Sequence, residues 1–184
     1  MLRILDIVFA LSGLILGLPL LLLVYVIGFF DTRSPLFFQQ RMGKDKKPFT
    51  LIKFRTMNLN TASVASHLAS ASSITKMGAF LRKSKIDELP QLWNVLLGDM
   101  SLVGPRPNLY NQSDLISERD ILGIYSVRPG ITGLAQISNI DMSKPKLLAE
   151  TDAKMIRTMS LKNYFKYIAQ TVSGKGSGDR VIKS

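Results

Sequence analysis

The sequence predicts a mostly helical α+β fold in which an N-terminal membrane helix precedes one small domain. Three features predict it: an uncharged apolar run from Ile7 to Phe30, amphipathic helical patterns further along, and one pair of short alternating segments between residues 34 and 55. A chain of 184 residues is long enough for one domain with a buried core and too short for a second full domain. We therefore expect a membrane segment over residues 1–32, a domain over 33–172 and a flexible tail over 173–184.

Composition narrows the partners that the chain can have. The formal net charge is +11, from 24 Lys and Arg against 13 Asp and Glu, so the surface should attract anions. Hydrophobic residues make up 46% of the chain, which is unusual for a soluble nucleic-acid binder and typical of a basic protein held at a membrane. Cysteine is absent, which excludes disulfides and a cysteine nucleophile. The single histidine, His67, lies among Ala and Ser, and we expect it to be solvated rather than catalytic.

The apolar run carries Pro19 near its centre. It exceeds the length of a usual signal-peptide core, and no small-residue cleavage site follows Phe30. Proline bends a helix because it lacks the N–H that would bond to the carbonyl four residues earlier. Each half holds about 12 residues and spans roughly 18 Å, too short to cross a hydrocarbon core of roughly 30 Å. With basic residues at both ends, a re-entrant helix bent at Pro19 and a kinked spanning helix fit equally well.

A short β-hairpin should follow the apolar run. Residues 34–41 and 49–55 alternate aromatic and polar side chains, and the segment between them is rich in Gly, Asp and Lys. Residues 58–75 are rich in Ser, Ala, Asn and Thr with little apolar period, which predicts a mobile loop or a weak helix.

Residues 76–97 have helical patterning. Four large side chains at helical spacing predict one buried face: Leu89, Leu92, Trp93 and Leu96. Since proline is tolerated only in the first turn, Pro90 places the helix start near Asp87, with Asp87 or Ser84 as the cap. An acidic pair such as Asp87 and Glu88 can serve at a helix start purely as a capping device.

Two turn-rich segments, residues 98–107 and 127–136, each place an arginine beside prolines and glycines. Proline stiffens the backbone, glycine lets it approach a ligand, and arginine offers a fork of donors that matches phosphate. Arg106 and Arg128 therefore suggest a phosphate clamp, with ordinary tight turns and solvated arginines as the alternative.

The last predicted helix is strongly amphipathic. Its apolar face consists of Leu161, Tyr164, Phe165, Ile168, Ala169 and Val172. Lys162 and Lys166 flank that face, so the helix belongs either to the core or to a membrane interface, and the mixture of Tyr, Phe and Lys favours the interface.

Four ordered blocks, residues 53–57, 85–96, 98–107 and 128–133, resemble the bacterial sugar transferase family of small monotopic phosphoglycosyl transferases. The resemblance implies transfer of a sugar 1-phosphate from a UDP-sugar to undecaprenyl (polyprenyl) phosphate, with release of UMP. This would be the first membrane step in assembling an O-antigen, capsule, exopolysaccharide or glycoprotein glycan. It also implies a re-entrant helix hairpin and a small catalytic domain on the cytoplasmic face of the bacterial inner membrane. The resemblance is compatible with a homodimer, and nucleic acid is not an expected partner.

The resemblance also assigns roles to residues. Asp87 would be the nucleophile that carries a covalent phosphosugar, and Glu88 the second acid, as a metal ligand or proton acceptor. Mg²⁺ is the expected cofactor, held by Asp87 and Glu88 with phosphate oxygens and water. Five further side chains are candidates for substrate contacts: Lys53, Arg55, Arg106, Arg128 and Gln136.

The chain departs from the family pattern at two places. Leu18 precedes Pro19 where the family has a serine before the proline that breaks the helix. After Asp152, Ala153 to Met155 replace residues that are often aromatic in the family, which puts sugar or nucleotide contacts there in doubt.

Two other functions remain open from the residues alone. A membrane-anchored adaptor could bind acidic lipid through the basic surface, and would keep its function after Asp87→Asn. A metal-dependent hydrolase of lipid-linked phosphates could use the same two acids, and would release phosphate or sugar phosphate instead of UMP.

Overall fold

The computed structural model describes residues 1–61 and 71–176. His67 and half of the predicted loop over 58–75 lie outside these ranges. The α-helices are α1 (Leu2–Thr32), α2 (Lys76–Ser84), α3 (Gln91–Leu97), α4 (Ser113–Ile121), α5 (Leu134–Ile137), α6 (Pro145–Arg157) and α7 (Leu161–Val172). The strands are β1 (Leu36–Met42), β2 (Pro48–Phe54), β3 (Ser101–Val103) and β4 (Gly130–Thr132). Short 3₁₀ turns are η1 (Lys44–Lys46), η3 (Ala71–Ser73), η4 (Ile86–Glu88) and η5 (Ile124–Ser126). The predicted mostly helical α+β fold is confirmed.

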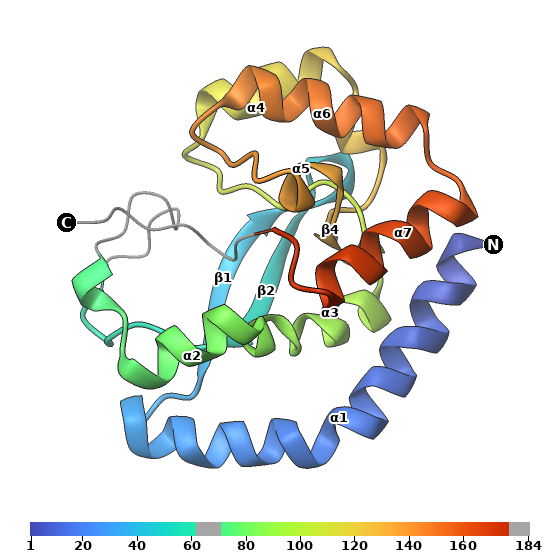
Figure 1. Cartoon of the computed structure of the whole chain (residues 1–184). Coiled ribbons are helices and arrows are strands. Elements are labelled where there is room, and N and C mark those ends of the chain that lie inside the picture. Colours follow the sequence, from blue (N-terminus) through green and yellow to red (C-terminus); the bar gives the residue numbers. More distant parts are fainter. Residues whose placement is uncertain (62–70, 177–184) are drawn as a thin grey trace.

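Helix α1 is a single 31-residue helix that contains Pro19. Its two halves run in different directions along one side of the molecule (Figure 1), so the helix bends but continues through the proline instead of breaking near it. Within residues 1–61 and 71–176, α1 is the one helix that is long and apolar enough to cross a membrane. Most of its large apolar side chains point outward; Leu16, for example, is 81% exposed.

The N-terminal half of α1 is tied to the domain by two charged residues. The buried carboxylate of Asp6 accepts hydrogen bonds at Oδ1 from the Ser101 hydroxyl (3.0 Å), the Leu102 N–H (3.0 Å) and the Tyr164 hydroxyl (2.8 Å). Burial and the bond to Asp6 raise the pKa of Tyr164, so this hydroxyl stays protonated and keeps donating. Arg3 donates to carbonyl oxygens just after α3 and at its last turn. Neither the contacts of Asp6 nor those of Arg3 were predicted from the sequence.

The predicted β-hairpin is confirmed. Strands β1 and β2 pair antiparallel from Leu36 opposite Phe54 to Met42 opposite Pro48. Helix α3 crosses this hairpin because the Asn94 side chain bonds to the Thr50 carbonyl (2.7 Å) and accepts from the Ile52 N–H (3.0 Å). A main core cluster lies between α1, β2 and α3 and contains Ala10, Phe49, Leu51, Val95 and Met100.

The predicted helical stretch over 76–97 divides into α2, η4 and α3. Lys85, with a φ of 59°, ends α2, and Pro90 occupies the cap position of α3, so neither Asp87 nor Ser84 caps it. The predicted buried face was wrong at Trp93, which is 51% exposed. Because α3 lies between α1 and β2, its polar residues Gln91 and Asn94 are buried along with Val95.

The two arginine-bearing loops meet through a parallel pair that the sequence analysis did not predict. Strands β3 and β4 align Ser101 with Gly130 and Val103 with Thr132. A Cβ added at Gly130 would lie 2.0 Å from the Gly104 nitrogen, so this approach requires glycine.

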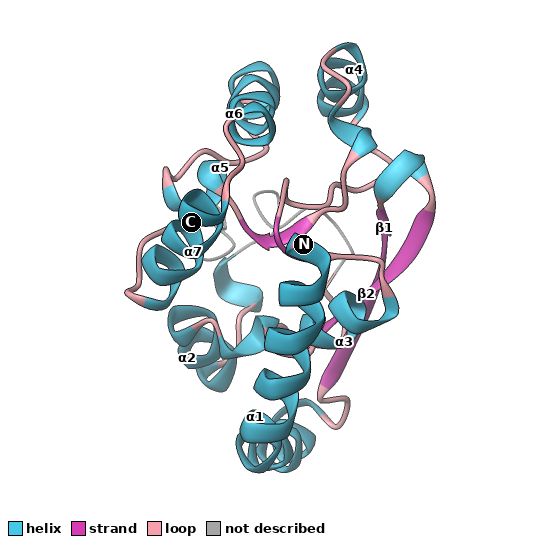
Figure 2. Cartoon of the chain, turned by 90° about the vertical axis from the view of Figure 1, so that its right-hand side faces the viewer, coloured by secondary structure: helices cyan, strands magenta, loops and turns pink. Residues whose placement is uncertain are grey.

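Helix α7 packs part of its apolar side into the core, whereas its place at a membrane interface stays a prediction. Tyr164 and Tyr167 are buried, while Phe165 is 45% exposed and packs edge-on against Phe9 of α1 at a ring distance of 5.9 Å. Helices α4 and α6 lie at the end of the molecule away from the bend of α1 (Figures 1 and 2). After α7, the described residues 173–176 run back across the domain, where the Lys175 carbonyl accepts from the Lys85 ammonium (2.7 Å).

Candidate active site

The acid pair lies in the short turn η4, which contacts both α2 and the hairpin strand β2. Asp87 is buried, with 4% of its surface exposed. The turn exists because Lys85 ends α2 in a left-handed conformation and Pro90 prevents an earlier start of α3. The two carboxylates are therefore held by tertiary packing of an irregular turn between two helices.

Glu88 belongs to a small charged cluster. Its Oε1 accepts from the Arg106 guanidinium at 2.9 Å, and both side chains are mostly shielded from solvent. Burial lowers the pKa of Lys85, the nearby Glu88 charge raises it, and the Arg106 charge lowers it further. The structure thus places Arg106 and Lys85 beside Glu88, the neighbour of Asp87 in the turn η4.

Two buried arginines form hydrogen bonds to the backbone of the loop that carries Arg106. Together with Asp152 they make up a brace for this loop. Arg119 donates to the Arg106 carbonyl (2.9 Å) and to the Asp152 carboxylate (2.7 Å), and Arg41 donates to the Pro107 carbonyl (3.2 Å). Arg119 and Asp152 are 2% and 0% exposed. Burial raises the pKa of the Asp152 carboxyl, and the Arg119 charge opposes that rise. This brace could not be predicted from the sequence, because its members are distant in sequence and charged residues on helices are usually solvated.

Arg128 has a different bonding partner from Arg106. Its Nε donates to the Gly98 carbonyl at 2.7 Å, at the C-terminal end of α3. It lines a cavity of about 290 Å³ together with Arg3 and Lys44, whereas Glu88 lines a different cavity. The two loops of the predicted clamp are adjacent, but Arg106 bonds to the Glu88 carboxylate and Arg128 to a backbone carbonyl.

Lys53 and Arg55 both lie on the hairpin beside the ring of Phe37. The Arg55 guanidinium stacks over that ring at 5.3 Å and donates to the Ser34 and Leu36 carbonyls, and burial lowers its pKa. The Lys53 ammonium lies over the same ring at 5.6 Å. These contacts give Arg55 a role in joining α1 to the hairpin.

Gln136 in α5 is buried at both polar atoms of its side-chain amide, and neither atom has a hydrogen-bond partner in the described structure. An unpaired buried amide is costly, by about 1–3 kcal/mol per group. Gln136 lines neither the cavity of Glu88 nor that of Arg128, and its contact with substrate stays a prediction.

The oxygen donors of the acid pair are of the kind that Mg²⁺ binds. The described residues contain no group of three or more His, Cys, Asp or Glu side chains that could enclose a metal. Mg²⁺ seldom needs one, because it commonly binds one or two carboxylates and completes its shell with water and substrate phosphates. Asp87 and Glu88 therefore fit this ion on the chemistry of their oxygens.

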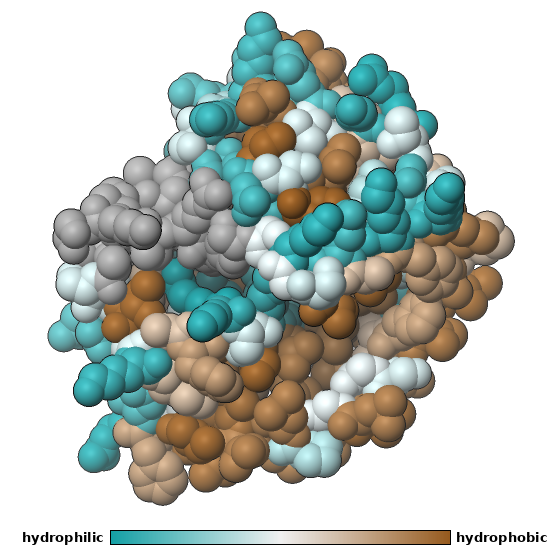
Figure 3. Space-filling view, viewed as in Figure 1, coloured by the Kyte–Doolittle hydropathy of each residue, from teal (hydrophilic) through white to brown (hydrophobic). Residues whose placement is uncertain are grey.

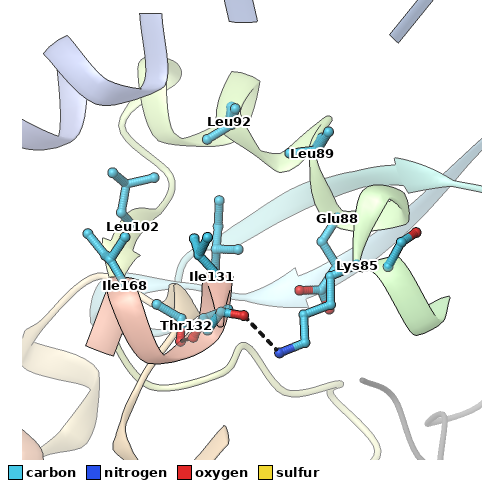
Figure 4. A pocket seen from close by; sticks show the side chains of 11 residues that line it. Lys85, Glu88, Leu89, Leu92, Leu102, Ile131, Thr132 and Ile168 are labelled. Atoms are coloured by element: carbon cyan, nitrogen blue, oxygen red, sulfur yellow. Dashed lines mark hydrogen bonds between the residues drawn. The ribbon is translucent and has the colours of Figure 1, made fainter. Parts of the chain in front are cut away.

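An apolar cavity of about 320 Å³ opens beside Glu88 (Figure 4). It lies between α3, β3, β4 and α7, and its lining consists of Ser84, Lys85, Glu88, Leu89, Leu92, Leu102, Ile131, Thr132, Ile168, Thr171 and Val172.

An exposed apolar helix, a buried Asp87 next to a Glu88–Arg106 ion pair and an adjoining aliphatic cavity together define a membrane-associated protein with a site suited to phosphate chemistry. The chain belongs to the bacterial sugar transferase family, whose sequence profile matches residues 1–175.

Named relatives agree with this membership. The chain is 38% identical over 182 residues to "UDP-glucose:undecaprenyl-phosphate glucose-1-phosphate transferase" of Caulobacter vibrioides, covering 92% of this chain and 67% of that protein. It is 32% identical to "UDP-galactose-lipid carrier transferase" of Erwinia amylovora, covering 92% of this chain and 39% of the relative. It is 36% identical to "UDP-N-acetylgalactosamine-undecaprenyl-phosphate N-acetylgalactosaminephosphotransferase" of Aeromonas hydrophila, covering 85% and 39%. The chain thus spans well under half the length of two of these relatives.

Proposed function

We propose that this protein transfers a sugar 1-phosphate from a UDP-sugar to a polyprenyl phosphate such as undecaprenyl phosphate, releasing UMP. The observation that carries the proposal is the buried Asp87 beside the Glu88–Arg106 ion pair, at the edge of an aliphatic cavity, in a member of this family. The relatives' names supply the substrate classes, a UDP-sugar and undecaprenyl phosphate.

The first step is attack of an Asp87 carboxylate oxygen on the phosphorus next to the sugar. A new P–O bond forms to Asp87, the phosphoanhydride bond breaks, and UMP leaves with the bonding electron pair. Arg106 is placed to offset phosphate charge because its guanidinium already lies at Glu88. A carboxylate nucleophile avoids bringing two phosphorylated substrates together in a single displacement.

The second step returns the enzyme to its starting state. A phosphate oxygen of the polyprenyl phosphate attacks the same phosphorus, the bond to Asp87 breaks, and the carboxylate is released. The product is a polyprenyl diphosphate sugar. Glu88 assists by holding Arg106 in place at 2.9 Å, and it accepts the proton that a singly ionised polyprenyl phosphate loses from its attacking oxygen.

Asp87 and Glu88 are the residues that would hold Mg²⁺. Bound there, the ion would supply positive charge against the diphosphate of the donor. The side chains then keep their own tasks, with Asp87 as nucleophile and Arg106 as a fixed cationic contact.

The membrane placement belongs to the same proposal. We infer that α1 enters the bilayer from the cytoplasmic face, bends and returns to it, since its N-terminal half is bonded to the domain through Asp6 and Arg3. Its C-terminal half is bonded as well, because Asp31 accepts from the Thr75 hydroxyl at 2.7 Å. A helix fixed to one domain at both ends is hard to reconcile with ends on opposite sides of a membrane. The reaction would be the first membrane step of glycoconjugate assembly.

The decisive experiment supplies the purified protein with a panel of UDP-sugars, Mg²⁺ and undecaprenyl phosphate, and measures UMP. We expect UMP and a polyprenyl diphosphate sugar from at least one donor, and loss of both with Asp87→Asn. Mass spectrometry of the enzyme mixed with donor alone should find a phosphosugar on Asp87. Release of sugar phosphate or free phosphate would instead identify the hydrolase, and an Asp87→Asn protein of normal activity would refute the nucleophile.

A further inference from the structure

The cavity beside Glu88 has a charged end and an apolar end. Lys85, Glu88 and Ser84 line one end, and Leu92, Leu102 and Ile168 line the other. Figure 4 shows Lys85 and Glu88 on one side of the cavity and Leu102 and Ile168 on the other. Every apolar residue in its lining is aliphatic. Such a cavity suits a molecule with an anionic head and an aliphatic tail.

The apolar end adjoins the membrane helix. A Cβ added to Gly13 of α1 would lie 3.0 Å from the Leu92 side chain, so Leu92 packs directly on that helix. Leu102 packs in one cluster with Leu2 and Leu5 of α1. The exposed apolar surface of the molecule lies over this same helix (Figure 3). The apolar end of the cavity is therefore formed by residues that pack on or beside α1.

We propose that this cavity binds the first isoprenoid units of the polyprenyl phosphate acceptor, with the acceptor phosphate at the charged end. The inference rests on the proposed function and assigns a site to one of its two substrates. A UDP-sugar has no aliphatic part that could fill such a lining, whereas a polyprenyl phosphate joins a phosphate to a methyl-branched chain. Burial of that chain against Leu102, Ile131 and Ile168 would hold it.

The volume and the charges of the cavity agree with binding of only the first part of the polyprenyl phosphate. A volume of about 320 Å³ is at the lower end for a small-molecule pocket, so it accepts only the start of the chain while the rest stays in lipid. Lys85 at the charged end and Arg106 beyond Glu88 offset the charge of the acceptor phosphate. The acceptor oxygen then lies next to the acid pair, as the second step requires.

Filling the cavity from two different elements, α7 and β4, tests the proposal. Ile168→Phe fills it from α7 and Ile131→Phe from β4, and Ile121→Phe, at a position of α4 that is 76% exposed, is the matched control. We expect both filling variants to raise the KM for undecaprenyl phosphate by about tenfold, since a change of a few methylenes in an apolar pocket has effects of this size. The KM for the UDP-sugar should stay within twofold, and the control should change neither. Equal rises in both KM values, or no rise for the acceptor, would overturn the inference.

A binding measurement keeps the test independent of turnover and of folding defects. A polyprenyl phosphate with a diazirine on its first isoprene unit is photolysed with the wild-type protein, and labelled peptides are mapped by mass spectrometry. We expect adducts on α3 and α7 that undecaprenyl phosphate competes away, and Ile168→Ala, which cannot clash, should retain them. Labelling confined to other segments would refute the site.

The two proposals can fail separately. Wild-type product formation with an unchanged acceptor KM in both filling variants refutes the cavity and leaves the proposed function intact. A wild-type protein that forms no product with any donor refutes the function, while competed labelling of α3 and α7 would still establish the lipid-phosphate site.

Discussion

The two arginine loops look alike in sequence and differ in what they contact. Arg106 and Arg128 each lie among prolines and glycines, and the loops meet through the β3–β4 pair. Arg106 bonds to a carboxylate of the acid pair, whereas Arg128 bonds to a backbone carbonyl at the end of α3. Proline and glycine explain the path of each loop, but the role of an arginine depends on the partner that a distant element brings to it. Substitutions in the two loops, and at the residues that hold them, test whether the two arginines differ in function.

The largest effect is expected under the Arg106 loop, at Asp152→Ala. It leaves Arg119 buried without its carboxylate, and breaking such a pair costs about 3–5 kcal/mol of stability. Denaturant unfolding in detergent measures this loss. The control Glu150→Ala changes an exposed carboxylate of the same helix and should leave the unfolding midpoint nearly unchanged. A midpoint in Asp152→Ala equal to that of the control would show that the brace carries little energy.

The next largest effect is on catalysis, at Arg106→Ala. Loss of one fixed cationic contact to a reacting phosphate should lower kcat by about 10²–10³-fold. Stability should change little, because the loop keeps its backbone bonds to Arg119 and Arg41. Stopped assays of UMP release give kcat, and unfolding curves give the stability. A stability loss with normal kcat would assign Arg106 a structural role instead.

The third prediction concerns the contact between the two loops, which the substitution Gly130→Ala should disturb. The added Cβ would lie 2.0 Å from the Gly104 nitrogen and 2.7 Å from the Thr132 carbonyl oxygen, and backbone atoms cannot move aside as side chains do. We expect a loss of about 1–3 kcal/mol, the usual cost of overpacking. Gly123→Ala in the neighbouring turn has open space around the new methyl, although its φ of 65° adds strain, and should cost less. The reverse order of the two variants would argue against the close approach of β3 and β4.

The elements that the sequence predicted correctly are the ones that local pattern specifies. The apolar length of α1, the alternation of the hairpin and the presence of the last helix, α7, follow from residues near one another in the chain. The assignment of Asp87, Glu88 and Arg106 to one substrate site came from the family resemblance and not from a local pattern. The brace of Arg119 on Asp152, the bonds of Asp6 and the β3–β4 pair join residues far apart in sequence, and no local pattern signals them. Trp93 was misplaced because spacing shows which residues share a face of α3, but not which neighbour covers it.

The smallest effect, and the one that most directly separates the two loops, is expected at Arg128→Ala. Loss of its bond to the Gly98 carbonyl should cost about 1 kcal/mol of stability. Because Arg128 and Glu88 line different cavities, kcat should stay within a few-fold of the wild type. Arg128→Lys serves as the control, since it keeps the charge but loses the fork of donors. If instead kcat falls as far as in Arg106→Ala while stability is unchanged, then both arginines contact phosphate, and the loops form the clamp that their sequences suggest.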